Sequence, residues 1–187
     1  MKLILASKSP RRKEILEKFG FTFDVVTANF NEVCYLNDPE RTAKENALGK
    51  AKAVYDKLSD KTITVLGSDT IVCLDGEILG KPKDGKEAEI MLKKLSGKTH
   101  SVITGYAVIN AERATVGAEE SLVTFNNLDD KIIAQYVKSG SPLDKAGAYG
   151  IQDDFPIVKS YQGSLYNVIG LPIEKIIPLL KDKKKQC

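Results

Sequence analysis

The stretch Lys2-Leu-Ile-Leu-Ala-Ser-Lys-Ser-Pro-Arg-Arg12 indicates a short buried strand that runs directly into a helix. Ser9 is a good N-cap, Pro10 suits the first helical position, and Gly20 is expected to end the helix. A helix N-terminus presents free N–H groups and the positive end of the helix dipole, which favour an anion.

The same turn carries two hydroxyls and two guanidiniums, on Ser7, Ser9, Arg11 and Arg12. Arg is suited to bidentate contacts with phosphate. The turn therefore predicts a phosphate site. The ordinary alternative is a well-capped helix with two solvated arginines.

The composition is that of a soluble protein, with 42% hydrophobic and 28% charged residues. A length of 187 residues suits one domain, or two small lobes that share a cleft, and we predict a single domain over residues 1–187. The net charge of +3 is accounted for by the lysine-rich tail 181–185, so the rest of the chain is neutral. A neutral body argues against stable nucleic-acid binding.

The cysteines are far apart and show no metal-ligand spacing, which indicates a reducing compartment. They are Cys34, Cys73 and Cys187. The first apolar run is shorter than the core of a signal peptide, and no run approaches membrane-spanning length. We therefore expect a cytoplasmic protein with no membrane partner.

Apolar, β-branched runs alternate with segments of helical periodicity, which predicts an α/β fold with a sheet flanked by helices. Strands are expected at 2–6, 62–74, 100–110, 120–126 and 165–169. Helices are expected after Ser9, from the capping box Thr42–Glu45, from Asp84 to Gly97, around 132–137, and after Pro172. The two runs between 100 and 126 have no helix between them, so the sheet is expected to be mixed.

Several segments resemble known catalytic or binding motifs but lack a required residue. Gly97-Lys-Thr99 lacks the first glycine of a P-loop, because Leu92 stands in its place. The single His100 has no Cys or His cluster nearby, and a structural role is expected for it. No Ser-His-Asp arrangement can be drawn. Carboxylates, lysines and a metal remain as the means of catalysis.

Polar residues stand where apolar ones are expected. Asp69 interrupts the strand-like run Val65–Val72 and needs a cation, a metal or hydrogen-bond donors as partner. The alternative is an aspartate in a turn or bulge. Lys81 follows Gly80 and precedes Pro82, which would hold it in place, although a surface lysine fits equally well.

A glycine-rich segment, 141–152, suits a loop that wraps a ligand, or an ordinary connection. It carries Asp144, Lys145 and Gln152, and the amide of Gln152 suits a base edge. Glu32 and Lys50 are weaker candidates, since a single carboxylate or helix lysine is usually solvated.

Together these residues form a consistent set for binding and hydrolysing a polyphosphate. Cations and a helix N-terminus hold the phosphates, and Glu32 with Asp69 can hold Mg²⁺, which prefers oxygen ligands. A carboxylate beside such a metal orients or deprotonates a water that attacks phosphorus, and lysines stabilise the developing charge.

The chain resembles the Maf family of nucleoside triphosphate pyrophosphatases over nearly its full length. The motifs that carry the resemblance are Leu5-Ala-Ser-Lys-Ser-Pro-Arg-Arg12, Gly67-Ser-Asp-Thr70, Gly80-Lys-Pro82, Leu95-Ser-Gly-Lys-Thr-His100, Asp144-Lys-Ala-Gly-Ala-Tyr-Gly-Ile-Gln152 and Val168-Ile-Gly-Leu-Pro172. Each is weak alone, but six in this order are specific.

The resemblance implies an elongated mixed sheet with two lobes around a central cleft (Maf/ITPase-like). It implies cleavage between the α and β phosphates, dependent on a divalent metal (Mg²⁺ or Mn²⁺). Asp69 matches the catalytic base, and Glu32, Lys50 and Lys81 match residues that handle metal or phosphate. The substrate-binding residues are expected to be Ser7, Ser9, Arg11, Arg12, Thr70, Lys145 and Gln152.

By resemblance, Arg11, Thr70 and Gln152 favour the branch that hydrolyses dTTP and UTP, with modified pyrimidine nucleotides as further candidates. The branch that acts on 7-methyl-GTP tends to carry Trp, Gln and Glu there, and this chain has no Trp. Two features depart from the family pattern. The segment 46–49 carries less charge than is usual, and its Gly49 weakens a helix, which bears on the placement of Lys50. Asp153-Asp154 stands where glycines are expected, and its carboxylates could lower affinity or recruit metal.

The leading hypothesis is a housecleaning enzyme that acts as a homodimer and can also affect cell division. The rival is a nucleotide sensor that inhibits septum formation by binding alone. A catalytic carboxylate at position 69 favours the enzyme, because a sensor would not need it.

Overall fold

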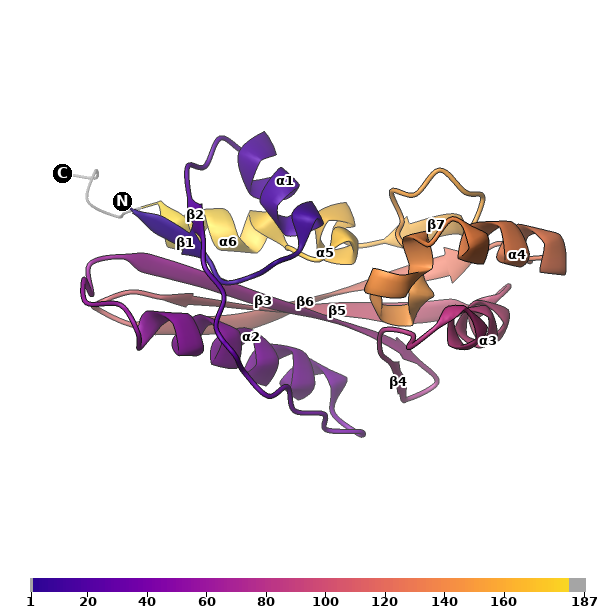
Figure 1. Ribbon diagram of the computed structural model, residues 1–187, viewed down its shortest axis with the longest axis horizontal. Helices are drawn as coiled ribbons and strands as arrows, with labels where there is room; N and C mark the ends of the chain where they lie inside the picture. Colours follow the sequence, from indigo (N-terminus) through magenta and orange to yellow (C-terminus); the bar gives the residue numbers. More distant parts are fainter. Residues whose placement is uncertain (1, 182–187) are drawn as a thin grey trace.

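The computed structural model describes residues 2–181, so the lysine-rich tail from 182 onward, with Cys187, lies outside it. A long sheet forms the centre of the molecule (Figure 1). Its strands are β1 (Leu3–Leu5), β2 (Asp24–Val25), β3 (Thr64–Leu74), β4 (Glu77–Leu79), β5 (Thr99–Ile109), β6 (Ala114–Phe125) and β7 (Val158–Gln162). Within residues 2–181 they form one seven-stranded sheet in the order β2-β1-β3-β5-β6-β7, with β4 paired to β3.

The sheet is mixed, as the sequence predicts. β1 is parallel to β2 and β3, whereas the other pairs are antiparallel. β3, β5 and β6 run the length of the molecule, with β1 and β2 toward one end and β4 and β7 toward the other (Figure 1). The prediction of an α/β fold with an elongated mixed sheet is therefore confirmed.

Helices cover both faces of the sheet. They are α1 (Pro10–Lys18), α2 (Pro39–Tyr55), α3 (Gly85–Leu95), α4 (Asp130–Lys138), α5 (Leu165–Ile169) and α6 (Ile173–Leu180), with 3₁₀ turns η1 (Ser141–Asp144) and η2 (Ala146–Ala148). α1 and α6 pack on Leu66 and Val108, and α2 packs on Val65 and Ala107. Successive residues of a strand point to opposite faces, so α2 lies across the sheet from α1 and α6 (Figure 1).

The edge of β3 is interrupted at its middle. β1 pairs with residues 64–66 of β3 and β4 pairs with residues 72–74, which leaves 67–71 without a strand on that side among the described residues. β1 runs parallel to β3 and β4 runs antiparallel to it, so both strands end at this break. The chain segments that follow β1 and β4 therefore leave the sheet at the same place.

Three element predictions are wrong. The strand expected at 120–126 is only the second half of β6, which begins at Ala114. The run 165–169 is the helix α5, because Ser164 Oγ accepts a hydrogen bond from the Asn167 N–H at its start and Gly170 ends it with a φ of 119°. Such a short apolar run fits a strand or a helix equally well. α2 begins at Pro39 rather than at Thr42, since Asp38 is its N-cap and accepts from the N–H of Arg41.

The N-terminal turn differs from the prediction in one respect. Ser9 occupies the N-cap position of α1, but its side chain makes no capping hydrogen bond. Its hydroxyl is thus not committed to the helix. Of the described helices, none is both long and apolar enough to span a membrane.

Candidate active site

A cavity of about 270 Å³ opens at the break in the edge of β3. Its lining includes ten of the residues that the sequence singled out: Ser9, Arg11, Arg12, Glu32, Lys50, Asp69, Thr70, Lys81, Lys145 and Gln152. Ser7 lines an adjoining pocket that shares seven of its lining residues with the cavity. The eleven predicted residues come from distant parts of the sequence, and the fold brings all of them together.

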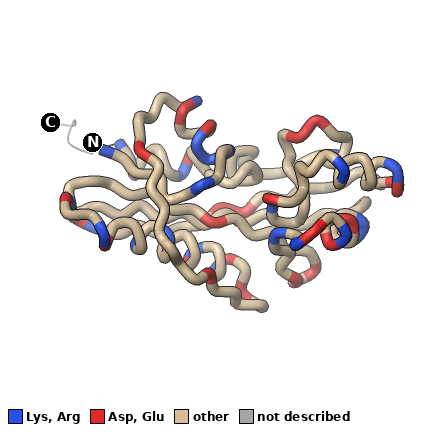
Figure 2. Tube along the Cα trace, in the orientation of Figure 1, with Lys and Arg blue, Asp and Glu red and all other residues tan. Residues whose placement is uncertain are grey.

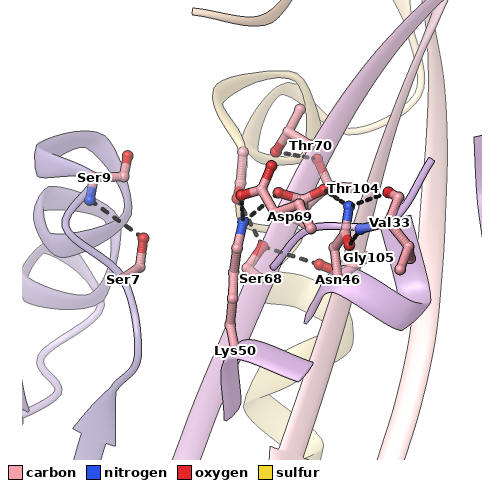
Figure 3. Close-up of polar contacts among 12 residues, drawn as sticks. Ser7, Ser9, Val33, Asn46, Lys50, Ser68, Asp69, Thr70, Thr104 and Gly105 are labelled. Atoms are coloured by element: carbon pink, nitrogen blue, oxygen red, sulfur yellow. Dashed lines mark hydrogen bonds and ion pairs between the residues drawn. The ribbon is translucent and has the colours of Figure 1, made fainter. Parts of the chain in front are cut away.

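Asp69 lies in regular β3 backbone, paired with Gly105 of β5, so the alternative of a turn or bulge is wrong. It is only 8% exposed. Its Oδ1 accepts a hydrogen bond from Lys50 Nζ at 2.6 Å (Figure 3). The carboxylate in the strand thus has the cationic partner that its burial requires.

Close packing of α2 on the sheet makes this pairing possible. A Cβ atom on Gly105 would lie 2.2 Å from the backbone oxygen of Ala43, which no real contact allows. The glycine opposite Asp69 therefore lets α2 approach the sheet closely. This approach brings Lys50, on the sheet-facing side of α2, to Asp69.

Lys50 also binds the second carboxylate, with its Nζ 2.7 Å from Glu32 Oε1. Burial raises the pKa of Glu32, but the hydrogen bond and charge of Lys50, with the charges of Lys81 and Arg12, outweigh it and lower that pKa. Gly49 has a use here, because a Cβ on it would lie 2.1 Å from the ring of Phe30. The helix glycine thus seats the segment that carries Glu32, and it does not displace Lys50.

Arg12 ties three parts of the chain together beside the cavity. Its guanidinium donates to Gly170 O at 2.8 Å, to Ser7 Oγ at 3.1 Å and to Thr70 Oγ1 at 3.1 Å. Burial lowers the pKa of Arg12 from its usual value, and the charge of Asp69 opposes that shift. A guanidinium has five N–H donors, so two remain for a ligand.

Arg11 forms an ion pair with another residue that lines the cavity. Its Nη1 donates to Asp144 Oδ2 at 2.7 Å. Lys81 lines the same cavity and, within residues 2–181, forms no ion pair. Among the described residues, the ammonium of Lys81 thus has no carboxylate partner and is available to an anion, as are the two remaining N–H groups of Arg12.

Lys145, unlike Lys81, is committed to contacts within the protein. It is buried, and its Nζ donates to Ser141 O at 2.5 Å, to Ser141 Oγ at 3.0 Å and to Asp144 Oδ1 at 3.1 Å. These contacts use all three of its N–H groups. Its predicted contact with substrate stays a prediction, and its observed contacts hold the loop that forms one wall of the cavity.

Asp153 belongs to the same loop network. Its Oδ2 accepts from Tyr136 Oη and, at 2.7 Å, from Ser141 Oγ. Tyr136 Oη in turn accepts from the N–H of Gly150 at 3.0 Å. The carboxylate of Asp153 thus supports the loop that presents Gln152. The effect of Asp153-Asp154 on affinity or metal stays a prediction.

The predicted metal site can be tested against the residues present. Within residues 2–181, no group of three or more His, Cys, Asp or Glu side chains is close enough to hold a metal ion. The site offers two carboxylates, Glu32 and Asp69, on either side of one ammonium. Two carboxylates fit Mg²⁺ when substrate phosphates and waters supply its other ligands, which is its usual mode in phosphoryl chemistry.

His100 is structural, as predicted. It is 2% exposed, and its Nε2 lies 2.8 Å from Tyr149 Oη. Burial lowers its pKa to about 4, so the ring is neutral. It supports Tyr149, which lines the cavity.

Sequence reasoning missed Asn46. This buried amide of α2 contacts both Asp69 and the backbone beside Glu32 (Figure 3). Its signal was available: Asn46, Gly49 and Lys50 fall at helical spacing on one face of α2, so an amide stands where a core residue is expected.

Comparison with known proteins identifies the family of the chain. The sequence profile of the family described as "Maf-like protein" matches residues 2–183. The chain belongs to the Maf family. A Thermococcus kodakarensis protein named dTTP/UTP pyrophosphatase is 46% identical over 93% of this chain and 93% of its own length. One of that name from Thermotoga maritima is 44% identical over 98% of this chain and 90% of its own length.

A solved structure supports the fold independently. The Staphylococcus aureus Ham1 protein superposes with a TM-score of 0.50 and 15% identity, covering 68% of this chain and 73% of that one. At this identity the likeness concerns the fold alone.

Proposed function

We propose that the protein hydrolyses dTTP and UTP to the nucleoside monophosphate and pyrophosphate, with Mg²⁺ or Mn²⁺ as cofactor. The observation that carries the proposal is Asp69, a buried strand carboxylate paired with Lys50 at the wall of a cavity rimmed by cations. Relatives named for this activity, at 44–46% identity over nearly the whole chain, support it.

The cavity lining favours one orientation of the nucleotide. Arg11, Arg12 and Lys81 lie beside the N-terminus of α1 and the end of β4 and suit the triphosphate. Val102 and Tyr149 line it together with Gln152. Apolar walls with one amide suit a pyrimidine, whose edge carries both donors and acceptors.

In the proposed reaction, a water oxygen attacks the α phosphorus, and Asp69 accepts the proton that this water loses. The bond from the α phosphorus to the bridging oxygen breaks, and pyrophosphate leaves with the electron pair. Lys50, Lys81 and Arg12 stabilise the negative charge that develops on the phosphoryl oxygens. A divalent cation held by Glu32 and Asp69 would neutralise charge on the triphosphate.

We also propose that the 187 residues fold as a single domain, because both ends of the molecule share β3, β5 and β6. The homodimer and the cytoplasmic location stay predictions from the sequence.

The test is pyrophosphate release from dTTP, UTP, CTP, GTP and 7-methyl-GTP, with Mg²⁺ or Mn²⁺ and after chelation by EDTA. We expect release from dTTP and UTP, its loss with EDTA, and its loss in Asp69→Asn. Release from 7-methyl-GTP alone would move the protein to the other branch. Tight nucleotide binding with no release from any triphosphate would refute the enzyme and favour the sensor.

A further inference from the structure

We propose that Asn46 is a positioning residue that sets the placement of both site carboxylates, Asp69 directly and Glu32 through the backbone of Val33. This inference rests on the proposed function, because it assigns Asn46 a part in that reaction. Asn46 does not line the cavity, so it is not a catalytic residue.

Asn46 is an amide at a core position of α2. It is 2% exposed, and the neighbouring Ala43 and Ala47 are fully buried. Burying an amide without partners costs roughly 2–7 kcal/mol, so an amide here is stable only if it is hydrogen-bonded. An alanine or leucine would serve the core packing without that requirement.

The amide makes three hydrogen bonds, and together they fix its orientation. Its Nδ2 donates to Asp69 Oδ2 at 3.1 Å and to Val33 O at 3.1 Å, and its Oδ1 accepts from the Val33 N–H at 2.8 Å (Figure 3). A flipped amide would place its oxygen against a carboxylate and a carbonyl, which are both acceptors. The donor side of Asn46 therefore faces Asp69.

These bonds restrict the rotation of the Asp69 carboxylate. Asn46 holds Oδ2 while Lys50 holds Oδ1, so each oxygen has one fixed donor from α2. A base held in one orientation is in place before substrate binds, which is the condition for efficient proton transfer.

The same amide anchors the segment that carries Glu32. Residues 26–37 contain no helix or strand, yet the backbone N–H and C=O of Val33 both form hydrogen bonds with the side-chain amide of Asn46. Phe30 packs on Gly49, one turn further along the same face of α2. Glu32 lies between these two anchor points and reaches Lys50. One amide thus couples the positions of the two carboxylates that would share a metal.

Thr42 provides a matched control on the same helix. It is 1% exposed, and its Oγ1 accepts from the Tyr35 N–H at 2.9 Å, so it anchors the same segment one turn earlier. It has no hydrogen bond with either site carboxylate. Thr42→Val and Asn46→Leu each remove a buried polar anchor between α2 and this segment, but only Asn46→Leu frees Asp69.

The experiment compares wild type, Asn46→Leu and Thr42→Val in kcat for dTTP, in affinity for a non-hydrolysable α,β-imido nucleotide, and in stability by urea unfolding. We expect Asn46→Leu to lower kcat by about 10- to 100-fold, as loss of groups that orient site ligands does. Its affinity for the analogue should stay within about threefold of wild type. Thr42→Val should lose about as much unfolding free energy as Asn46→Leu and keep kcat within about threefold of wild type.

The comparison of kcat with analogue affinity is the readout that a merely structural role would not move. A loss of stability alone would affect Asn46→Leu and Thr42→Val alike, whereas a loss of Asp69 orientation lowers kcat in Asn46→Leu and leaves its affinity for the analogue in place.

The outcomes separate the two proposals. Wild-type protein that releases no pyrophosphate refutes the proposed function. Active wild-type protein with Asn46→Leu and Thr42→Val equal in kcat refutes the role of Asn46 and leaves the proposed function standing.

Discussion

Lowering the pH from 7 to 5 should destabilise the protein through His100, the only histidine of the chain. Burial lowers its pKa from 6.5 to about 4 in the folded state. On unfolding the ring regains its usual pKa and binds a proton. The unfolded state therefore binds more protons over this range, and stability falls as the pH falls from about 6.5 toward 4.

The magnitude follows from the two pKa values. For a group that titrates at 6.5 unfolded and near 4 folded, the loss of unfolding free energy between pH 7 and pH 5 is about 2 kcal/mol. That corresponds to roughly a 30-fold change in the folding equilibrium. The cause is local: the ring is packed edge-on against Phe125 and Tyr149, and its Nδ1 has no hydrogen-bond partner within residues 2–181.

The assay is urea unfolding at pH 7, 6 and 5 for the wild type and His100→Phe. Titration of the carboxylates is common to both proteins and cancels in the difference. Phe cannot titrate, so the wild type should lose about 2 kcal/mol more than the variant between pH 7 and 5. Unfolding free energies that fall in parallel for the two proteins would refute the reasoning.

Two further predictions concern packing around the site. Arg12→Lys should lower the unfolding free energy by about 1–3 kcal/mol in urea and raise KM for dTTP, because one ammonium cannot reach Ser7, Thr70 and Gly170 together; unchanged stability would contradict this. Gly105→Ala should cost about 3 kcal/mol in thermal unfolding and lower kcat, because its Cβ would push α2 away from the sheet; normal activity would show that this close approach is unnecessary.

The sequence predicts the site better than it predicts the elements. Asp69 and Lys81 stand out because their surroundings are apolar or conformationally restricted, and those surroundings are visible in the sequence. The five-residue apolar runs 2–6 and 165–169 are different, because local pattern alone does not separate a helix from a strand in so short a segment. Ser164 and Gly170, which cap α5 at its two ends, favour a helix over a strand for the run 165–169.

Asn46 could not be assigned a role before the structure was known. A buried amide signals that partners exist, but not which ones, and here the partners come from β3 and from a segment without regular structure. Likewise, the sequence shows only that Asp153 is a carboxylate beside Gln152. Its hydroxyl partners, Tyr136 and Ser141, are identified by the structure. Long-range contacts of this kind depend on tertiary packing rather than on local sequence.

The positive and negative residues are interspersed along the chain (Figure 2). Unpaired strand edges are a separate hazard for self-association. Residues 67–71 of β3 form such an edge, but it is short and bounded by β1 and β4. An extended strand from another chain would need several consecutive residues and would meet those two strands first. The interruption thus leaves room for the cavity and at the same time protects a central strand from intermolecular β-pairing and aggregation.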